Sequence, residues 1–403
     1  MNKELAWILN AIEAAGETAM KDGVYWRGTY TEQDAAVVKL LSRYMEDGGM
    51  KVSSDAAGNL FGTIAGTEGG VIMSGSHRDT VRLGGKYDGM LGIVTAICAA
   101  SSLYQELGKP VRTLRIVAMC EEESSRFTTS NYIGSSHICG LVTKDMLQVA
   151  DDNGITMETA MRDAGYLQEP LRRECEDISH FVELHIEQGG LLEAAEKQTG
   201  IVTSIVGLCC GEVTFTGQQN HAGTTPMYLR QDPMPVCADF ISKLMAWAEK
   251  YQDDMVCTVG KITAEPGNAN VIAEKITCTF DIRSENPQRL AEAKDILVHL
   301  TETLRGTVDA ALEIACQEPP VQLDADGVQR LTQLAESRGI SYRKMPSGAG
   351  HDSQVIARHV KTNMIFVPSV SGISHNPKEY TRPADIEAGY LLLKDYLRAL
   401  AWN

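Results

Sequence analysis

Histidine and glutamate residues follow four short apolar segments of this 403-residue chain. Each segment is short enough to be one buried strand. In a parallel α/β sheet the carboxyl ends of the strands line the crevice where ligands bind, so the residues that follow the segments are predicted to converge. The segments and their followers are Val71–Ser74 with His77, Ile116–Met119 with Glu121-Glu122-Glu123, Phe181–Leu184 with His185, and Met364–Val367 with His375.

A fifth metal-type residue, Asp88, lies in the glycine-flanked segment Gly84–Gly89, where glycine permits tight turning and close backbone approach. Three imidazoles and two carboxylates suit two divalent ions that share one carboxylate. These ligand types accept several ions, and manganese and zinc are our two candidates. The predicted ligands are His77, Asp88 and His185 on one ion, and the bridging Asp88 with Glu123 and His375 on the other.

Two further carboxylates have predicted roles beside these ligands. Asp79 follows His77 by two residues, and we expect its carboxylate to accept the second N–H of that imidazole. Glu122 is the predicted general base, which takes a proton from the attacking water and passes it to the leaving nitrogen.

Each of these signals also has an ordinary structural interpretation. A histidine after a strand is more often a structural or surface residue than a ligand, and a run of three glutamates is usually a solvated acidic stretch. Paired glycines usually mark simple turns. The metal interpretation depends on five such residues falling at equivalent positions of one predicted sheet.

The elements that must position these residues alternate between helices and strands, which is typical of an α/β layer with a largely parallel sheet. Apolar residues at three- and four-residue spacing predict the helices, and short β-rich runs predict the strands. The predicted helices are Glu4–Ala15, Glu32–Gly48, Met90–Leu107, one that starts near His351, and Ala384–Ala401; the strands are Leu60–Ile64, Val71–Ser74, Thr113–Met119, Phe181–Leu184 and Asn363–Val367.

The middle of the chain differs in character and predicts a smaller α+β domain inserted into the first. Residues 1–207 and 326–403 are assigned to the metal-binding catalytic domain and residues 208–325 to the insertion. Its predicted strands are Glu212–Thr216, Met255–Thr263 and Ala273–Arg283, and its predicted helices lie near 233–250 and 287–305.

Composition limits the functions available. The formal net charge of −16 argues against nucleic acid, because phosphate backbones require a basic face. No run of about 18 apolar residues and no basic-then-apolar leader is present, so we expect a cytoplasmic protein without a membrane partner. The ten cysteines show no C-x-x-C pair and are expected to be reduced core residues.

Longer motifs surround the candidate ligands from about Gly58 to the C-terminus. At these motifs the chain resembles the branch of the dinuclear metallopeptidase and aminoacylase clan that comprises allantoate amidohydrolases, N-carbamoyl-L-amino acid hydrolases and β-ureidopropionases. The motifs are Gly75-Ser76-His77-Arg78-Asp79-Thr80-Val81, Glu183-Leu184-His185-Ile186-Glu187-Gln188-Gly189, Asn220-His221-Ala222-Gly223-Thr224-Thr225-Pro226-Met227, Ser347-Gly348-Ala349-Gly350-His351-Asp352 and Gly372-Ile373-Ser374-His375-Asn376-Pro377.

The resemblance implies two metal ions on the five ligands already named, with Glu122 as catalytic acid and base. It also implies that the inserted domain is a lid through which a homodimer forms. Arg283 would bind the substrate carboxylate, and His221 would support the tetrahedral oxyanion. The remaining implied substrate contacts are Gln188, Asn270, Gly350 and His351.

The run Cys120-Glu121-Glu122-Glu123 and the segment Gly260–Pro266 resemble allantoate enzymes, so allantoate is the favoured ureido substrate. A carbamoyl amino acid or β-ureidopropionate substrate stays open, because Cys209-Cys210 replaces an arginine pair typical of allantoate enzymes. Ser124 and Arg78 are further departures, in places where the family usually has glycine and an apolar residue.

Two more distant classes of protein share parts of this pattern. A dipeptidase or aminoacylase of the same clan usually carries aspartate or glutamate where His185 stands. A non-catalytic metal-binding regulatory protein is disfavoured because Glu122 is present.

Overall fold

The computed structural model describes every residue of the chain except 1, 129–131, 168–174, 305 and 307. The chain divides into two compact units. The first comprises Met1–Thr203 and Gln322–Asn403, and the second is Ser204–Val321. The first unit is therefore built from both ends of the chain.

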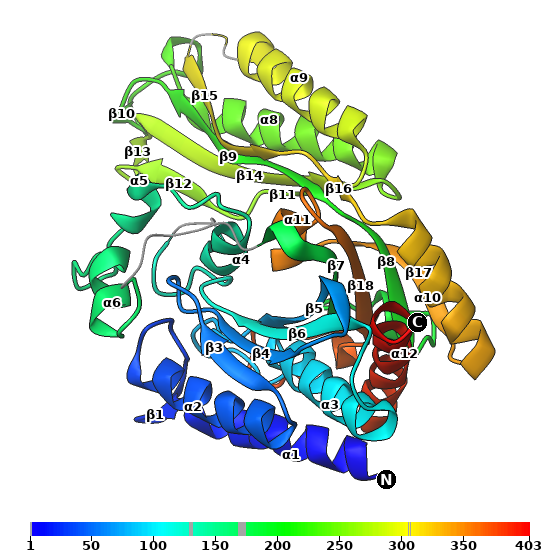
Figure 1. The fold of residues 1–403 in the computed structure, drawn as a ribbon. Coiled ribbons are helices and arrows are strands. Elements are labelled where there is room, and N and C mark those ends of the chain that lie inside the picture. Colours follow the sequence, from blue (N-terminus) through cyan, green and yellow to red (C-terminus); the bar gives the residue numbers. More distant parts are fainter. Residues whose placement is uncertain (1, 129–131, 168–174, 305, 307) are drawn as a thin grey trace. The chain divides into compact units, whose positions relative to one another are not determined.

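Four adjacent strands of the first unit run parallel to one another and form the middle of its sheet (Figure 1). Their order is β18 (Lys361–Val367), β7 (Ile178–Ile186), β5 (Glu68–His77) and β6 (Arg112–Met119). These are the four strands that the candidate ligands follow, so their carboxyl ends meet at one edge of the sheet.

The edges of this sheet are antiparallel, which corrects the expectation of a largely parallel sheet. Beside β6 lie β4 (Leu60–Ile64) and β3 (Lys51–Ser54), both in antiparallel pairing. Only residues 65–67 link β4 to β5, too few for the crossover that a parallel connection requires. Beside β18 lies the antiparallel β8 (Thr199–Ile205), which also pairs with β17 (Tyr342–Ser347) and β16 (Val321–Gln322).

The two faces of the parallel strands pack into different apolar clusters, as the two-residue period of a strand requires. Ile72, Ile116 and Leu184 pack on one side against the long helices. Val117 and Phe181 pack on the opposite side against α4 (Ile133–Ile138) and α11 (Asp352–Ile356). The long helices are α1 (Lys3–Thr18), α2 (Glu32–Asp47), α3 (Met90–Leu107), α10 (Ala325–Arg338) and α12 (Pro383–Ala401).

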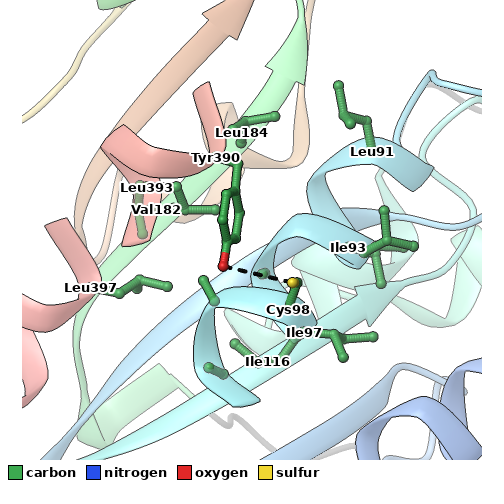
Figure 2. Packing of buried hydrophobic residues seen from close by; sticks show 14 of the residues in the cluster. Leu91, Ile93, Ile97, Cys98, Ile116, Val182, Leu184, Tyr390, Leu393 and Leu397 are labelled. Carbon is green, nitrogen blue, oxygen red and sulfur yellow. Dashed lines mark hydrogen bonds between the residues drawn. The ribbon is translucent and has the colours of Figure 1, made fainter. Parts of the chain in front are cut away.

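Helix α3 is the central helix of this cluster, and Figure 2 shows its residue Cys98 facing the hydroxyl of Tyr390 of α12, 3.7 Å away. Among the described residues, α3 is the one helix long and apolar enough to cross a membrane by length and composition. The corresponding window is 67% buried within the protein, as the core helix of a folded unit would be. Residues Met90–Ala100 are buried on all sides, which accounts for the apolar character of this part of the helix.

The second unit contains one antiparallel sheet with two helices packed on one face. The order is β11 (Met255–Thr258), β14 (Lys275–Ser284), β9 (Gly207–Thr216) and β15 (Asp309–Glu318), and β12 (Ile262–Glu265) also pairs with β14. The predicted strand Met255–Thr263 is thus two strands along the same edge of β14. The helices are α8 (Pro233–Ala248) and α9 (Pro287–Leu304), and a separate two-stranded ribbon joins β10 (Asn220–His221) to β13 (Val271–Ile272).

The remaining strands and α-helices among the described residues are short: β1 (Met20–Lys21), β2 (Val24–Tyr25), α5 (Lys144–Leu147), α6 (Met157–Asp163) and α7 (Leu191–Ala194). Seven of the ten cysteines are buried, as expected of core residues.

Candidate metal centre

The strand register brings the candidate ligands to one edge of the sheet. His77 is the last residue of β5 and pairs with Met119, the last residue of β6. His185, next to the end of β7, pairs with Phe366 of β18. His77 and His185 therefore come from neighbouring strands, and their ring centroids lie 5.5 Å apart.

The first candidate group consists of His77, Asp88 and His185, all buried. Asp88 Oδ1 lies 3.6 Å from His77 Nε2 and 3.2 Å from His185 Nε2, and the two histidine nitrogens are 3.3 Å apart. Asp88 Oδ1 is buried and accepts no hydrogen bond in the described structure. An unsatisfied carboxylate oxygen that faces two imidazole nitrogens suits a cation.

The second candidate group, Asp88, Glu123 and His375, shares Asp88 with the first. Here the other oxygen of Asp88 is used: Oδ2 lies 3.2 Å from His375 Nε2, which in turn lies 3.5 Å from Glu123 Oε2. Glu123 Oε1 is also buried without a hydrogen bond. The side chain of His375 is 48% exposed, so this group opens to solvent on the histidine side.

The buried carboxylates of Asp88 and Glu123 need nearby positive charge to stay ionised. Burial, followed by repulsion from Asp88, raises the pKa of Glu123 to about 7. Hydrogen bonding to Asp88 raises the pKa of His375 to about 9. Burial opposes ionisation of Asp88, yet the three surrounding histidines hold its pKa well below the usual value. Two divalent cations would supply the same stabilisation while leaving the imidazoles neutral, so the residues present fit a pair of metal ions.

Glu122 lies beside the first group rather than within it. Its Oε2 is 4.0 Å from His77 Nε2, and burial raises the pKa of its carboxyl well above the usual value despite the attraction of His77. Glu121 and Ser124 on either side have positive φ angles of 52° and 51°. These two left-handed residues turn the chain sharply, which places neighbouring carboxylates of the acidic run in different environments.

The structure corrects the expected contact of Asp79. The nearest carboxylate oxygen of Asp79 lies 3.9 Å from His77 Nδ1, whereas the backbone carbonyl of Asp79 lies 3.1 Å away. The carboxylate instead accepts the backbone N–H groups of Glu122 at 3.1 Å and Glu123 at 3.0 Å. Asp79 therefore orients the acidic run, and its main chain orients the histidine.

Gly89 is required by its surroundings. It has a φ of 64°, and a Cβ atom there would lie 2.4 Å from the carbonyl oxygen of His77. Any side chain at this position would separate the Asp88 loop from the end of β5.

Three predicted substrate contacts also lie in the first unit. Gln188 donates from Nε2 to Asp88 Oδ2 at 3.0 Å. His351 is buried, stacks edge-on against His185 at 4.6 Å, and has a pKa held well below the usual value by burial. A Cβ atom on Gly350 would lie 2.1 Å from the hydroxyl of Tyr132.

The other three belong to the second unit. His221 and Asn270 are neighbours at the two-stranded ribbon, where Ala222 N donates to the carbonyl of Asn270 at 3.0 Å. Arg283 lies on β14 and forms a two-pronged contact with Asp281, at 2.9 and 3.1 Å. The structure thus brings His221 close to Asn270 within this unit and places Arg283 on a different strand.

Sequence reasoning missed two features next to the centre. Glu379 is buried between the Asp88 and His375 loops, and no motif drew attention to it. Arg78, noted only as a departure, is completely buried and pairs with Asp34 at 2.6 and 3.1 Å. Arg78 stands where the family usually has an apolar residue, which indicated a buried ion pair. The sequence did not show that Asp34 is the partner of Arg78.

Comparison with known proteins agrees with this geometry. The model of peptidase family M20/M25/M40 matches residues 73–399. The allantoate amidohydrolase of Bacillus subtilis (strain 168) is 38% identical over 393 residues, which cover 95% of this chain and 94% of the relative. The N-carbamoyl-L-amino-acid amidohydrolase of Paenarthrobacter aurescens is 34% identical over 386 residues, 93% of this chain and 92% of the relative. Among solved structures, an amidase of the hydantoinase/carbamoylase family from Burkholderia multivorans superposes with a TM-score of 0.92 at 30% identity, covering 99% of this chain and 98% of that one.

Proposed function

Because the chain belongs to peptidase family M20/M25/M40, we propose that it is a metal-dependent amidohydrolase that cleaves the terminal ureido C–N bond of a small carboxylate. Allantoate is the favoured substrate, and the products are then ureidoglycine, ammonia and carbon dioxide. The observation that carries the proposal is Asp88, whose two carboxylate oxygens face two separate sets of metal-type residues. The allantoate amidohydrolase relative supports the substrate.

The five residues His77, Asp88, Glu123, His185 and His375 would hold the two ions, manganese or zinc. When bound, such ions polarise a carbonyl oxygen and lower the pKa of a water molecule. Glu122 takes the proton of the attacking water, since its carboxylate lies beside the first group and is buried. The same carboxyl then returns the proton to the departing nitrogen.

The second unit would supply further contacts to the substrate, in addition to those of the first unit. In this proposal it is a lid through which two copies of the chain dimerise, with its limits at Ser204 and Val321. Arg283 binds the substrate carboxylate, for which a planar guanidinium is well suited, and must exchange its present partner Asp281 to do so. His221 donates to the oxygen on which negative charge develops, and Asn270 is its neighbour. A cytoplasmic location belongs to the same proposal.

A second candidate substrate is an N-carbamoyl-L-amino acid. Similarity to the N-carbamoyl-L-amino-acid amidohydrolase of Paenarthrobacter aurescens supports this candidate. Ammonia release from allantoate, N-carbamoyl-L-amino acids and N-carbamoyl-β-alanine, measured side by side with manganese-reconstituted protein, separates these possibilities. Protein treated with EDTA is the control. Preference for allantoate is the expected result. If the manganese-reconstituted protein releases no ammonia from any of the three compounds, the ureido assignment is refuted.

A further inference from the structure

Glu379 connects the two loops that carry Asp88 and His375. Its Oε1 accepts the backbone N–H groups of Tyr87 at 3.0 Å and Asp88 at 3.1 Å. Its Oε2 accepts the hydroxyl of Ser374 at 3.0 Å, and this hydroxyl also lies 3.4 Å from Asp88 Oδ2. One carboxylate therefore holds the main chain of one candidate ligand and the residue before the other.

The space for this contact is reserved by Gly85. A Cβ atom at position 85 would lie 2.2 Å from Glu379 Oε1 and 2.4 Å from Glu379 Cβ. Glu379 itself is only 4% exposed. Placing a carboxylate here, next to the carboxylate of Asp88, is costly in a buried environment, and an apolar residue of similar size would fill the space more cheaply.

The loop that Glu379 anchors is held in a demanding conformation. His375 has a φ of 53°, in the left-handed region, and the following turn closes with Glu379 N donating to the carbonyl of Asn376 at 2.9 Å. A non-glycine residue keeps such a conformation only where its surroundings determine it. The hydrogen bonds of Glu379 and Ser374 tie this turn to the Asp88 loop, beside the contact of His375 Nε2 with Asp88 Oδ2 at 3.2 Å.

We propose that Glu379 is a positioning residue that fixes the Asp88 and His375 loops against each other, so that both candidate metal groups can share Asp88. It acts through the backbone of Asp88 and the hydroxyl of Ser374 and touches no reacting atom. The proposal rests on the metal centre of the proposed function and makes no use of the substrate.

The test measures the affinity of metal-free protein for Mn²⁺. Binding is measured by titration calorimetry and by equilibrium dialysis with elemental analysis. Glu379→Ala should weaken binding about 10- to 100-fold, as loss of a partner behind a metal ligand usually does. Glu379→Gln should stay close to the wild type, because its amide oxygen still accepts from Tyr87 and Asp88 and its amide nitrogen can donate to Ser374. Gly85→Ala should weaken binding like Glu379→Ala, since it displaces the same carboxylate from the opposite side.

Tyr380→Leu is the matched control. The ring of Tyr380 packs edge-on against Tyr87 at 6.0 Å, so this variant weakens the packing between the same two loops without removing a hydrogen bond of Glu379. It should lower the melting temperature and leave Mn²⁺ affinity unchanged. Wild-type affinity in both Glu379→Ala and Gly85→Ala would overturn the proposal, as would Glu379→Gln binding as weakly as Glu379→Ala. Because no substrate is present, failure here is distinguishable from failure of the ureido assignment.

Discussion

The buried ion pair between Arg78 and Asp34 offers a quantitative test of how the metal centre is supported. Arg78 is 0% exposed and Asp34 is 2% exposed. Besides its two contacts with Asp34, the guanidinium donates to the carbonyls of Gly58 at 2.9 Å and Ala118 at 3.0 Å. It therefore links the residue after His77 to the start of α2 and to the end of β6.

Replacing Arg78 with Met should destabilise the first unit by about 3–5 kcal/mol, because it leaves the carboxylate of Asp34 buried without its countercharge. The carboxylate of Asp34 keeps the hydrogen bond from Tyr30 N at 2.9 Å, which is not enough to compensate a charge. The double variant Arg78→Met/Asp34→Asn removes the charge and should regain part of this loss. A remainder of about 1–3 kcal/mol is expected from the carbonyls of Gly58 and Ala118, which lose their donor.

The assay measures the stability of the first unit. Its unfolding transition is recorded by calorimetry and by urea titration. The single variant should lower Tm by roughly 5–15 °C. Arg338→Met is the matched control, because Arg338 forms a comparable pair with Asp395 at the surface, where Arg338 is 37% exposed. Screening by solvent should limit its effect to about 1 kcal/mol or less. The reasoning fails if Arg78→Met costs no more than Arg338→Met, or if the double variant is as unstable as the single one.

Three further predictions concern catalysis. Glu122→Gln should reduce kcat about 10²- to 10⁴-fold while both ions stay bound, so a near-normal rate would remove Glu122 from the mechanism. Arg283→Ala should raise KM for carboxylate substrates about 10- to 100-fold through loss of a charged hydrogen bond. The control Arg289→Ala in the same unit should leave KM unchanged. Equal effects of the two variants would mean that the substrate carboxylate does not bind at Arg283. His221→Ala should lower kcat about 10²- to 10³-fold at constant metal content, and loss of metal without a change in kcat per bound ion would contradict its role as an oxyanion donor.

The elements that local pattern determines could be predicted from the sequence. Helix Met90–Leu107 has the predicted limits, because Gly89 and Gly108 bound a largely apolar stretch. Strand Leu60–Ile64 also has the predicted limits. The candidate ligands were found because each follows a recognisable strand, so their convergence required only that the four strands be parallel neighbours.

Other features depended on contacts that the local sequence does not contain. The antiparallel edges of the sheet, including β8 and β17, were not foreseen, since pairing at the edges follows from connection lengths and from distant partners. Helix α10 was also overlooked, although Asp324 and Gly339 at its ends are ordinary capping residues. The carboxylate of Asp79 contacts Glu122 and Glu123 rather than His77, because the backbone of the acidic run lies closer to it. Glu379 was missed because its partners are main-chain groups almost 300 residues away.

The position of β18 has a consequence for synthesis of the chain. This strand lies between β7 and β8 in the sheet, yet it is the last of the three to be made. Translation proceeds at about 5–20 residues per second, so β7 waits roughly 10–35 s after leaving the ribosome before its neighbour arrives. During that interval an apolar strand edge is open to pairing with other chains. A nascent chain of this protein should therefore depend on chaperones until the last 40 or so residues emerge, and truncations before Lys361 should aggregate rather than accumulate as partly active protein.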